Sequence, residues 1–99
     1  MSLRLSPSYG AEVLVLAYSD IDSRHTKSGA WAAAWGTDFA GPDLSQVVVC
    51  RRPDEPNVLL LGLNDSSSVV FDSAHLTVEE AKAYAEQEYP QLSYTWKAP

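Results

Sequence analysis

The sequence predicts an α+β fold, with a mainly antiparallel sheet of five to six strands and one helix packed on one face of that sheet. Two nearly unbroken apolar runs, Val47–Cys50 and Val58–Leu63, flank a turn at residues 53–56 and indicate a β-hairpin. Neither run alternates apolar and polar residues, so we expect both faces of these strands to be covered. With a helix signature after the strands, the predicted order is strand, strand, strand, strand, strand, helix, strand, with a meander through its middle.

The first half of the chain contributes two segments to this sheet. Residues 1–10 contain a proline, a glycine and three serines without a period, so we expect an irregular N-terminal arm. Glu12–Tyr18 holds five aliphatic residues in a row and predicts a buried strand. In Ala30–Gly36, Trp31 and Trp35 lie four residues apart, which puts them on one side of either a strand or a helix. We favour a strand for this segment, and a helix of two turns remains open.

Two further segments complete the sheet. Ser68–Phe71 is β-branched and aromatic and follows the turn-forming residues 64–67, so it predicts a third strand joined to the hairpin. Leu92–Lys97 alternates apolar and polar residues with period two and predicts a last strand at a sheet edge.

The helix is predicted from its capping signature. Residues 77–80 match the capping box, in which the Thr77 hydroxyl accepts from the Glu80 amide and the Glu80 carboxylate accepts from the Thr77 amide. Pro90 cannot continue a helix, so we expect the helix to begin at Val78 and to end near Glu88. A narrow apolar stripe at spacings of three and four residues predicts close docking on the sheet through Val78, Ala81, Ala85 and Tyr89.

Length and composition predict one soluble domain over residues 1–99. The 99 residues suffice for one core, and 45% apolar with 20% charged residues is typical of globular proteins. No apolar run approaches the roughly 18 residues that cross a bilayer, so we expect no membrane partner. The single cysteine agrees with a reducing compartment, and we expect a cytoplasmic location.

The net charge of −6 belongs to the second half of the chain. Residues 53–99 hold eight acidic side chains and two basic ones, whereas residues 1–52 hold five of each. An acidic surface repels phosphates, so we expect no nucleic-acid partner. It could attract a basic protein or mimic a nucleic acid, although an ordinary solvated surface is the commoner explanation.

The polar loop Asp20–Ser28 is the strongest candidate for acid/base or anion chemistry. His25 titrates near neutrality, Arg24 can hold an anion, and Asp22 lies beside them. The sequence does not place a second catalytic group next to His25, so an ordinary surface loop is the favoured interpretation. Trp31 and Trp35 are weak candidates for an interface or a ligand groove, because large aromatics are enriched in both.

Motifs with a dedicated chemistry are absent from the sequence. One cysteine and two distant histidines do not provide the four ligands of a structural zinc site, and no phosphate-binding loop is present. We therefore expect no metal and no cofactor. Cys50 ends an apolar run, which predicts a buried and inert thiol.

These observations favour a small acidic domain that acts as a non-enzymatic binding or protein-interaction module. The alternatives are a small enzyme that uses the loop Asp20–Ser28 through His25, and an acidic inhibitor or nucleic-acid mimic. One helix can cover only one face of the sheet, so we also expect a homodimer that covers the other face, with Trp31 and Trp35 in the contact. A sheet curled into a partial barrel is the alternative to that dimer.

Overall fold

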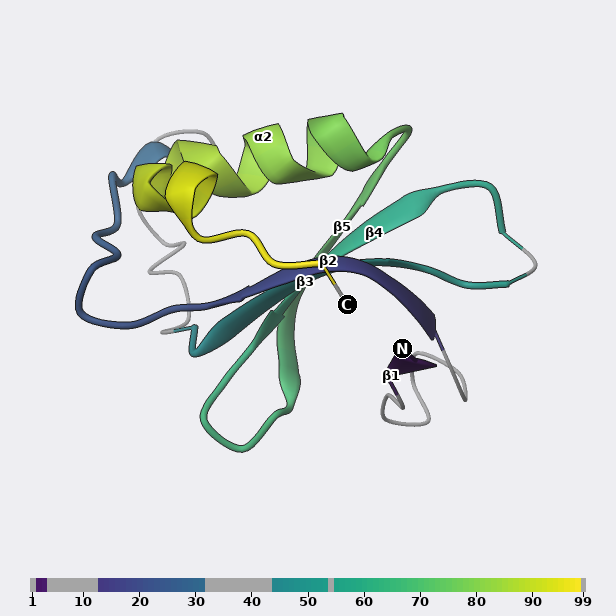
Figure 1. Ribbon diagram of the computed structural model, residues 1–99, viewed down its shortest axis with the longest axis horizontal. Coiled ribbons are helices and arrows are strands. Elements are labelled where there is room, and N and C mark those ends of the chain that lie inside the picture. Colours follow the sequence, from purple (N-terminus) through teal and green to yellow (C-terminus); the bar gives the residue numbers. More distant parts are fainter. Residues whose placement is uncertain (1, 4–12, 32–43, 54, 99) are drawn as a thin grey trace.

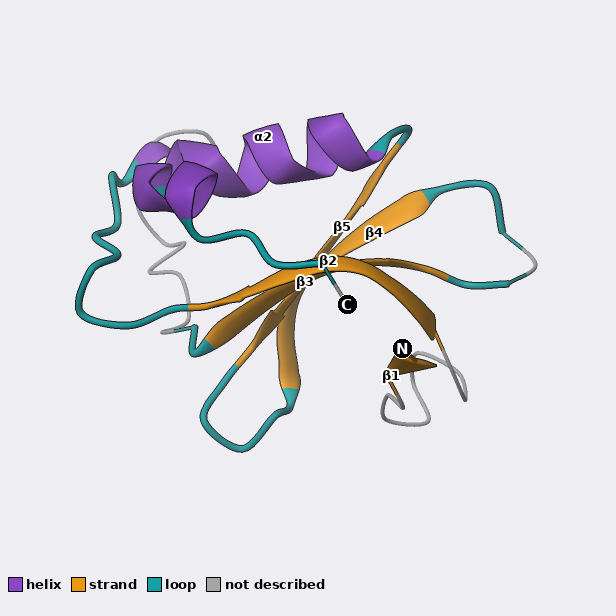
Figure 2. Cartoon of the chain, viewed as in Figure 1, coloured by secondary structure: helices purple, strands orange, loops and turns teal. Residues whose placement is uncertain are grey.

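The computed structural model describes residues 2–3, 13–31, 44–53 and 55–98 and shows an α+β fold with one antiparallel sheet. The strands lie in the sheet in sequence order, and Figure 1 labels each of them. They are β1 (Ser2–Leu3), β2 (Val13–Asp20), β3 (Gln46–Arg51), β4 (Val58–Leu63) and β5 (Val69–His75). Helix α2 (Val78–Glu88) and the short 3₁₀ helix η2 (Pro90–Tyr94) follow and lie together over one side of the sheet (Figures 1 and 2).

The central hairpin and the meander are confirmed. The two apolar runs become β3 and β4, which pair antiparallel with Val48 opposite Leu61. The strand expected at Ser68–Phe71 is β5, which extends to His75 because the pairing with β4 continues to Val58. The sheet therefore has four strands of six to eight residues, and the two-residue β1 pairs with the start of β2.

The predicted count of five to six strands is wrong in detail. Leu92–Lys97 is not a strand, because Pro90 begins a 3₁₀ turn in which Leu92 is buried and Tyr94 is exposed. In this segment, Lys97 pairs with the backbone of the sheet through a single bridge to Tyr18, and the Thr95 hydroxyl bonds to Ser19 Oγ of β2. In a segment of only six residues, the apolar/polar alternation of an edge strand does not differ clearly from the pattern of a short 3₁₀ helix that buries one residue.

The first residues of Ala30–Gly36 are helical, which contradicts the favoured strand. Ala30 and Trp31 begin a helical turn in which the Ala30 amide donates to Ser28 Oγ at 3.1 Å. The rest of this segment lies outside the described residues. Ser2 and Leu3 pair with β2, so this part of the expected irregular arm is a strand.

Helix α2 begins and ends where the capping pattern predicts. The Glu80 amide donates to Thr77 Oγ1 at 3.1 Å, whereas Glu80 Oε2 accepts from the Leu76 amide and not from that of Thr77. The apolar stripe packs on the sheet, with Ala81 and Ala85 fully buried. Within the described chain, no helix combines the length and the apolar character needed to span a membrane.

Replacing Thr77 by alanine is expected to lower the free energy of unfolding by about 1 kcal/mol, because the cap bond to the Glu80 amide is lost. Urea unfolding should show a lower midpoint at an unchanged slope. Thr26→Ala, a change at an exposed threonine outside the helix, is the matched control. Equal midpoints for the two variants would contradict the assigned helix start.

Both faces of the central strands are buried within one chain. The face toward α2 carries a core that includes Val47, Val49 and Leu60. The opposite face carries a second cluster whose members are at most 3% exposed: Val13, Val15, Val48, Cys50, Leu61 and Leu63. A second chain is therefore not required to cover these residues. The homodimer stays a prediction, and light scattering tests it against a monomer mass of 10.8 kDa.

Cys50 belongs to this second cluster and is fully buried. Burial raises the pKa of the thiol to about 11, so the reactive thiolate is scarce at neutral pH. We expect a thiol reagent to label the native protein far more slowly than the urea-unfolded chain. Labelling of both at similar rates would contradict the buried position.

Candidate functional site

The polar loop after β2 is organised by Asp22. Its carboxylate accepts three side-chain bonds from Arg24, from Nε to Oδ1 at 3.1 Å, from Nε to Oδ2 at 3.3 Å and from Nη2 to Oδ2 at 2.9 Å, and a further bond from the Arg24 amide. The Arg24 guanidinium holds the pKa of this carboxyl well below its usual range. The anion that Arg24 binds is thus Asp22 of the same loop, which leaves the guanidinium less available to an external anion.

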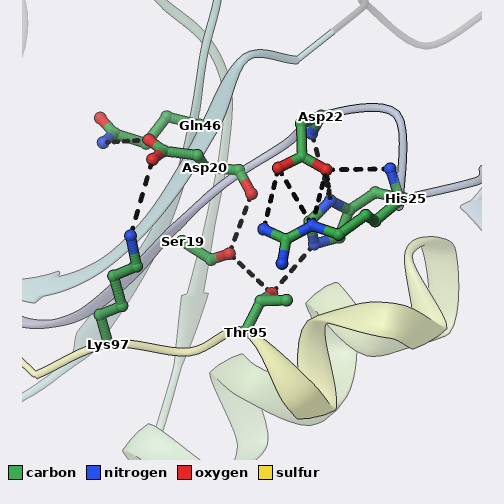
Figure 3. A network of polar contacts seen from close by, with 8 residues as sticks. Ser19, Asp20, Asp22, His25, Gln46, Thr95 and Lys97 are labelled. Carbon is green, nitrogen blue, oxygen red and sulfur yellow. Dashed lines mark hydrogen bonds and ion pairs between the residues drawn. The ribbon is translucent and has the colours of Figure 1, made fainter.

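His25 points inward from this loop, and its side chain is fully buried. Nδ1 accepts from the Asp22 amide at 3.1 Å, so this nitrogen carries no proton. Nε2 therefore carries the proton and donates to Thr95 Oγ1 at 2.9 Å. Figure 3 shows both contacts, with Thr95 approaching from the C-terminal segment.

The hydrogen bonds continue from Thr95 to β2, and each group donates to the next one in the chain. Having accepted from His25, the Thr95 hydroxyl donates to Ser19 Oγ at 2.8 Å, and Ser19 Oγ donates to the Asp20 carbonyl at 2.9 Å. Every polar hydrogen in this chain of contacts has an acceptor (Figure 3). The network therefore ties the loop to the C-terminal segment.

Asp22, His25 and Thr95 resemble a catalytic triad in residue type but not in hydrogen-bond direction. In a triad, Nδ1–H donates to the carboxylate and Nε2 accepts the proton of the nucleophile. Here Nδ1 is an acceptor and lies 3.3 Å from Asp22 Oδ1, another acceptor, while Nε2–H donates to the hydroxyl. Thr95 is not activated as a nucleophile in this arrangement, and the buried imidazole has no free lone pair for a substrate.

Replacing His25 by alanine is expected to lower the free energy of unfolding by about 1–3 kcal/mol, because the Asp22 amide and the Thr95 hydroxyl lose their partner. Arg24→Ala in the same loop changes an exposed side chain, whose ion pair is screened by water, and should cost less than His25→Ala. Thermal or urea unfolding measures both. A smaller loss for His25→Ala than for Arg24→Ala would contradict the structural role of the imidazole.

Glu88 is a buried carboxylate that the sequence reasoning missed. It is 3% exposed, and Oε1 accepts from the amides of Gly29 at 3.1 Å and Trp31 at 3.4 Å. A carboxylate in the last turn of a helix opposes the helix dipole. This unfavourable position in the sequence could have indicated that the Glu88 carboxylate is stabilised by other groups. In the structure these groups are the backbone amides at the start of the helical turn at Ala30.

Trp31 lies in the core and not at the surface, which corrects its expected place in an interface or groove. It is 2% exposed, stacks on Phe71 at a centroid distance of 4.4 Å and on Tyr84 at 5.3 Å, and donates from Nε1 to the Tyr84 carbonyl. Its indole therefore joins the helical turn, β5 and α2. Trp35, the second candidate, lies outside the described residues.

The two edges of the sheet differ in how they are covered. Along β2, the strand β1 pairs with Val13 and Leu14, and Lys97 exchanges both backbone bonds with Tyr18, at 3.1 and 2.7 Å. At the other end of the strand order, no described strand pairs with the outer side of β5. Among the described residues, the sheet therefore has one edge that is partly paired and one edge that is open.

The register shows which backbone groups face the open edge. Because Tyr18 bonds to Lys97, its backbone points away from β3, and the backbone of its partner Val48 points toward β4. Leu61, the partner of Val48, then points toward β3 and away from β5. The bonding direction alternates in this way across every antiparallel ladder.

Asp72 is the partner of Leu61, so its N–H and C=O point to the open edge, as do those of Ala74 two residues later. Both residues are exposed. Within the described chain, neither has a hydrogen bond on this side. Phe71, Ser73 and His75 bond to β4 instead.

A pocket adjoins the end of this edge. It has a volume of about 190 Å³ and is lined by Asn57, Ala74, His75, Leu76 and Glu80. Leu76 is 75% exposed. Burial lowers the pKa of His75 below its usual value, and Nε2 of this residue pairs with Ser73 Oγ, so the imidazole is neutral at pH 7.

Comparisons of the chain with protein-family models, with curated proteins and with solved structures found no match. Among the described residues there is no group of three or more histidine, cysteine, aspartate or glutamate side chains arranged to hold a metal ion. The polar loop after β2 and the open edge of β5 are therefore the two features from which we infer a function.

Proposed function

We propose that this chain is a non-enzymatic protein-interaction module that binds an extended segment of its partner by strand addition at the open edge of β5. The observation that carries this proposal is that the N–H and C=O groups of Asp72 and Ala74 point outward and have no partner among the described residues. Such a row is a template for another strand, and main-chain hydrogen bonds supply much of the affinity in strand addition.

The contrast between the two edges supports this choice of site. The β2 edge is paired with β1 and bridged by Lys97, so an added strand would have to displace parts of the same chain. Strand addition at β5 displaces no described residue. The pocket beside Ala74 gives the added segment a place for one side chain, which backbone pairing alone does not provide.

The enzyme alternative has less support, because the imidazole of His25 is buried and both ring nitrogens are engaged. An acidic inhibitor would also bind its target through the β5 edge. This alternative is therefore one form of the proposed interaction module. A cytoplasmic location remains part of the proposal, with which the single buried Cys50 agrees.

Selection from a library of random ten-residue peptides displayed on phage tests the proposal. We expect the immobilised chain to enrich peptides that lose binding to the Ala74→Pro variant, because proline removes the outward N–H and its ring obstructs the edge. Circular dichroism should first show that this variant remains folded.

Tyr94→Ala is the control for selection at another surface. Tyr94 is 90% exposed and lies in η2. Peptides that bind this variant normally but not Ala74→Pro support the β5 edge. Enrichment that depends on Tyr94, or no enrichment at all, would refute strand addition as the function.

A further inference from the structure

We infer that the strand added at β5 is basic: it carries lysine or arginine side chains that face Asp72 and enter the pocket beside Glu80. This inference rests on the proposed strand addition and specifies its partner. The occupant is thus an extended segment of a basic protein.

The charges around β5 are of one sign. No lysine or arginine occurs between Arg52 and Lys82, a stretch that includes all of β4 and β5 and the start of α2. Three exposed carboxylates lie in β5 and in the first turn of α2: Asp72, Glu79 and Glu80. Among the described residues, none of these three forms an ion pair.

Acidic residues elsewhere in the described chain have partners. Asp22 pairs with Arg24, Glu55 with Arg52 and Asp20 with Lys97. Glu88 accepts backbone amides, and Glu86 accepts from the Trp96 indole. Asp65 accepts from Ser45 Oγ. Within the described chain, Asp72 and Glu79 are thus without a hydrogen-bond or ion-pair partner, and Glu80 accepts only from the Leu76 amide.

Asp72 also disfavours a second copy of this chain as the occupant. It is the central residue of β5, so a two-fold antiparallel pairing centred on the strand would place two Asp72 carboxylates directly opposite each other. Like charges at directly opposed positions destabilise a strand pair, whereas opposite charges stabilise it by roughly 0.2–1 kcal/mol. A cationic side chain opposite Asp72 turns the same position into a favourable contact.

The pocket adds a second position for a cation. Ala74 both lines the pocket and directs its backbone to the open edge, so the pocket is continuous with the path of an added strand. Glu80 lines the pocket with a carboxylate, of which Oε2 also accepts from the Leu76 amide. Asn57 contributes a neutral amide, and His75, the other titratable group in the wall, is neutral at pH 7 and does not repel a cation.

Three synthetic ten-residue peptides test the inference, each alternating valine with lysine, glutamine or glutamate. Titration followed by the backbone amide resonances of Asp72 and Ala74 measures their affinities. We expect the lysine peptide to bind best, and the double change Asp72→Asn and Glu80→Gln to weaken it roughly tenfold. Glutamine keeps the acceptor for the Leu76 amide, so the helix start is retained.

The outcomes separate this inference from the proposed function. A glutamine peptide that binds as tightly as the lysine peptide would leave strand addition in place and overturn the basic partner. Lysine-peptide binding that persists in Ala74→Pro would show charge attraction without strand pairing and overturn the inference. Failure of all three peptides, or self-association of the chain through β5, would overturn it as well.

Discussion

Replacing Trp31 by alanine is expected to lower the free energy of unfolding by about 3–5 kcal/mol. The indole is buried, stacks on both Phe71 and Tyr84, and donates to the Tyr84 carbonyl, so its removal opens a cavity where three elements meet. A loss of this size is a large part of the stability of a typical small domain. Urea unfolding followed by circular dichroism measures it.

Tyr94→Ala is the matched control, since it removes another large aromatic side chain that is 90% exposed. We expect it to change the stability by less than about 0.5 kcal/mol. Trp31→Phe should lie between the two, because a smaller ring keeps part of the stacking and loses the bond to Tyr84. Equal effects of Trp31→Ala and Tyr94→Ala would contradict the core position of Trp31.

Two proline substitutions in β5 should differ in their cost to stability. Ser73 directs its amide to β4, so Ser73→Pro removes a bond within the ladder and is expected to cost about 3 kcal/mol. Ala74 directs its amide to the open edge, where proline is tolerated, and Ala74→Pro should cost much less. The same urea experiment compares them. A greater loss of unfolding free energy for Ala74→Pro than for Ser73→Pro would contradict the derived register and the open edge at Ala74.

The elements with strong local signals were predictable from the sequence. The apolar runs of β3 and β4 need burial on both faces, and the Thr77 hydroxyl can satisfy the first amides of α2 whatever lies around it. Leu92–Lys97 and Ala30–Gly36 were not predictable in the same way. Their conformations depend on distant partners, such as Glu88, whose carboxylate holds the amides of Gly29 and Trp31.

The candidate site was less predictable than the fold. The environment of His25 depends on Thr95, which is 70 residues away in sequence, and a polar loop pattern cannot show whether an imidazole points inward or outward. The open edge depends on the order of the strands in the sheet. The sequence of Val69–His75 does not reveal whether this strand lies at an edge or in the middle. Only the pairing of Tyr18 with Lys97 and the register that follows from it identify Asp72 and Ala74 as unpaired.

Amide hydrogen exchange in β5, without and with the alternating lysine–valine peptide, tests the central claim most directly. In the free chain, we predict fast exchange at Asp72 and Ala74 and slow exchange at Phe71, Ser73 and His75. Saturating peptide should slow exchange at Asp72 and Ala74 and leave the exposed amides of the Asp20–Ser28 loop unchanged. Protection of Asp72 and Ala74 already in the free chain, or fast exchange there at saturating peptide, would contradict an open edge that accepts a strand.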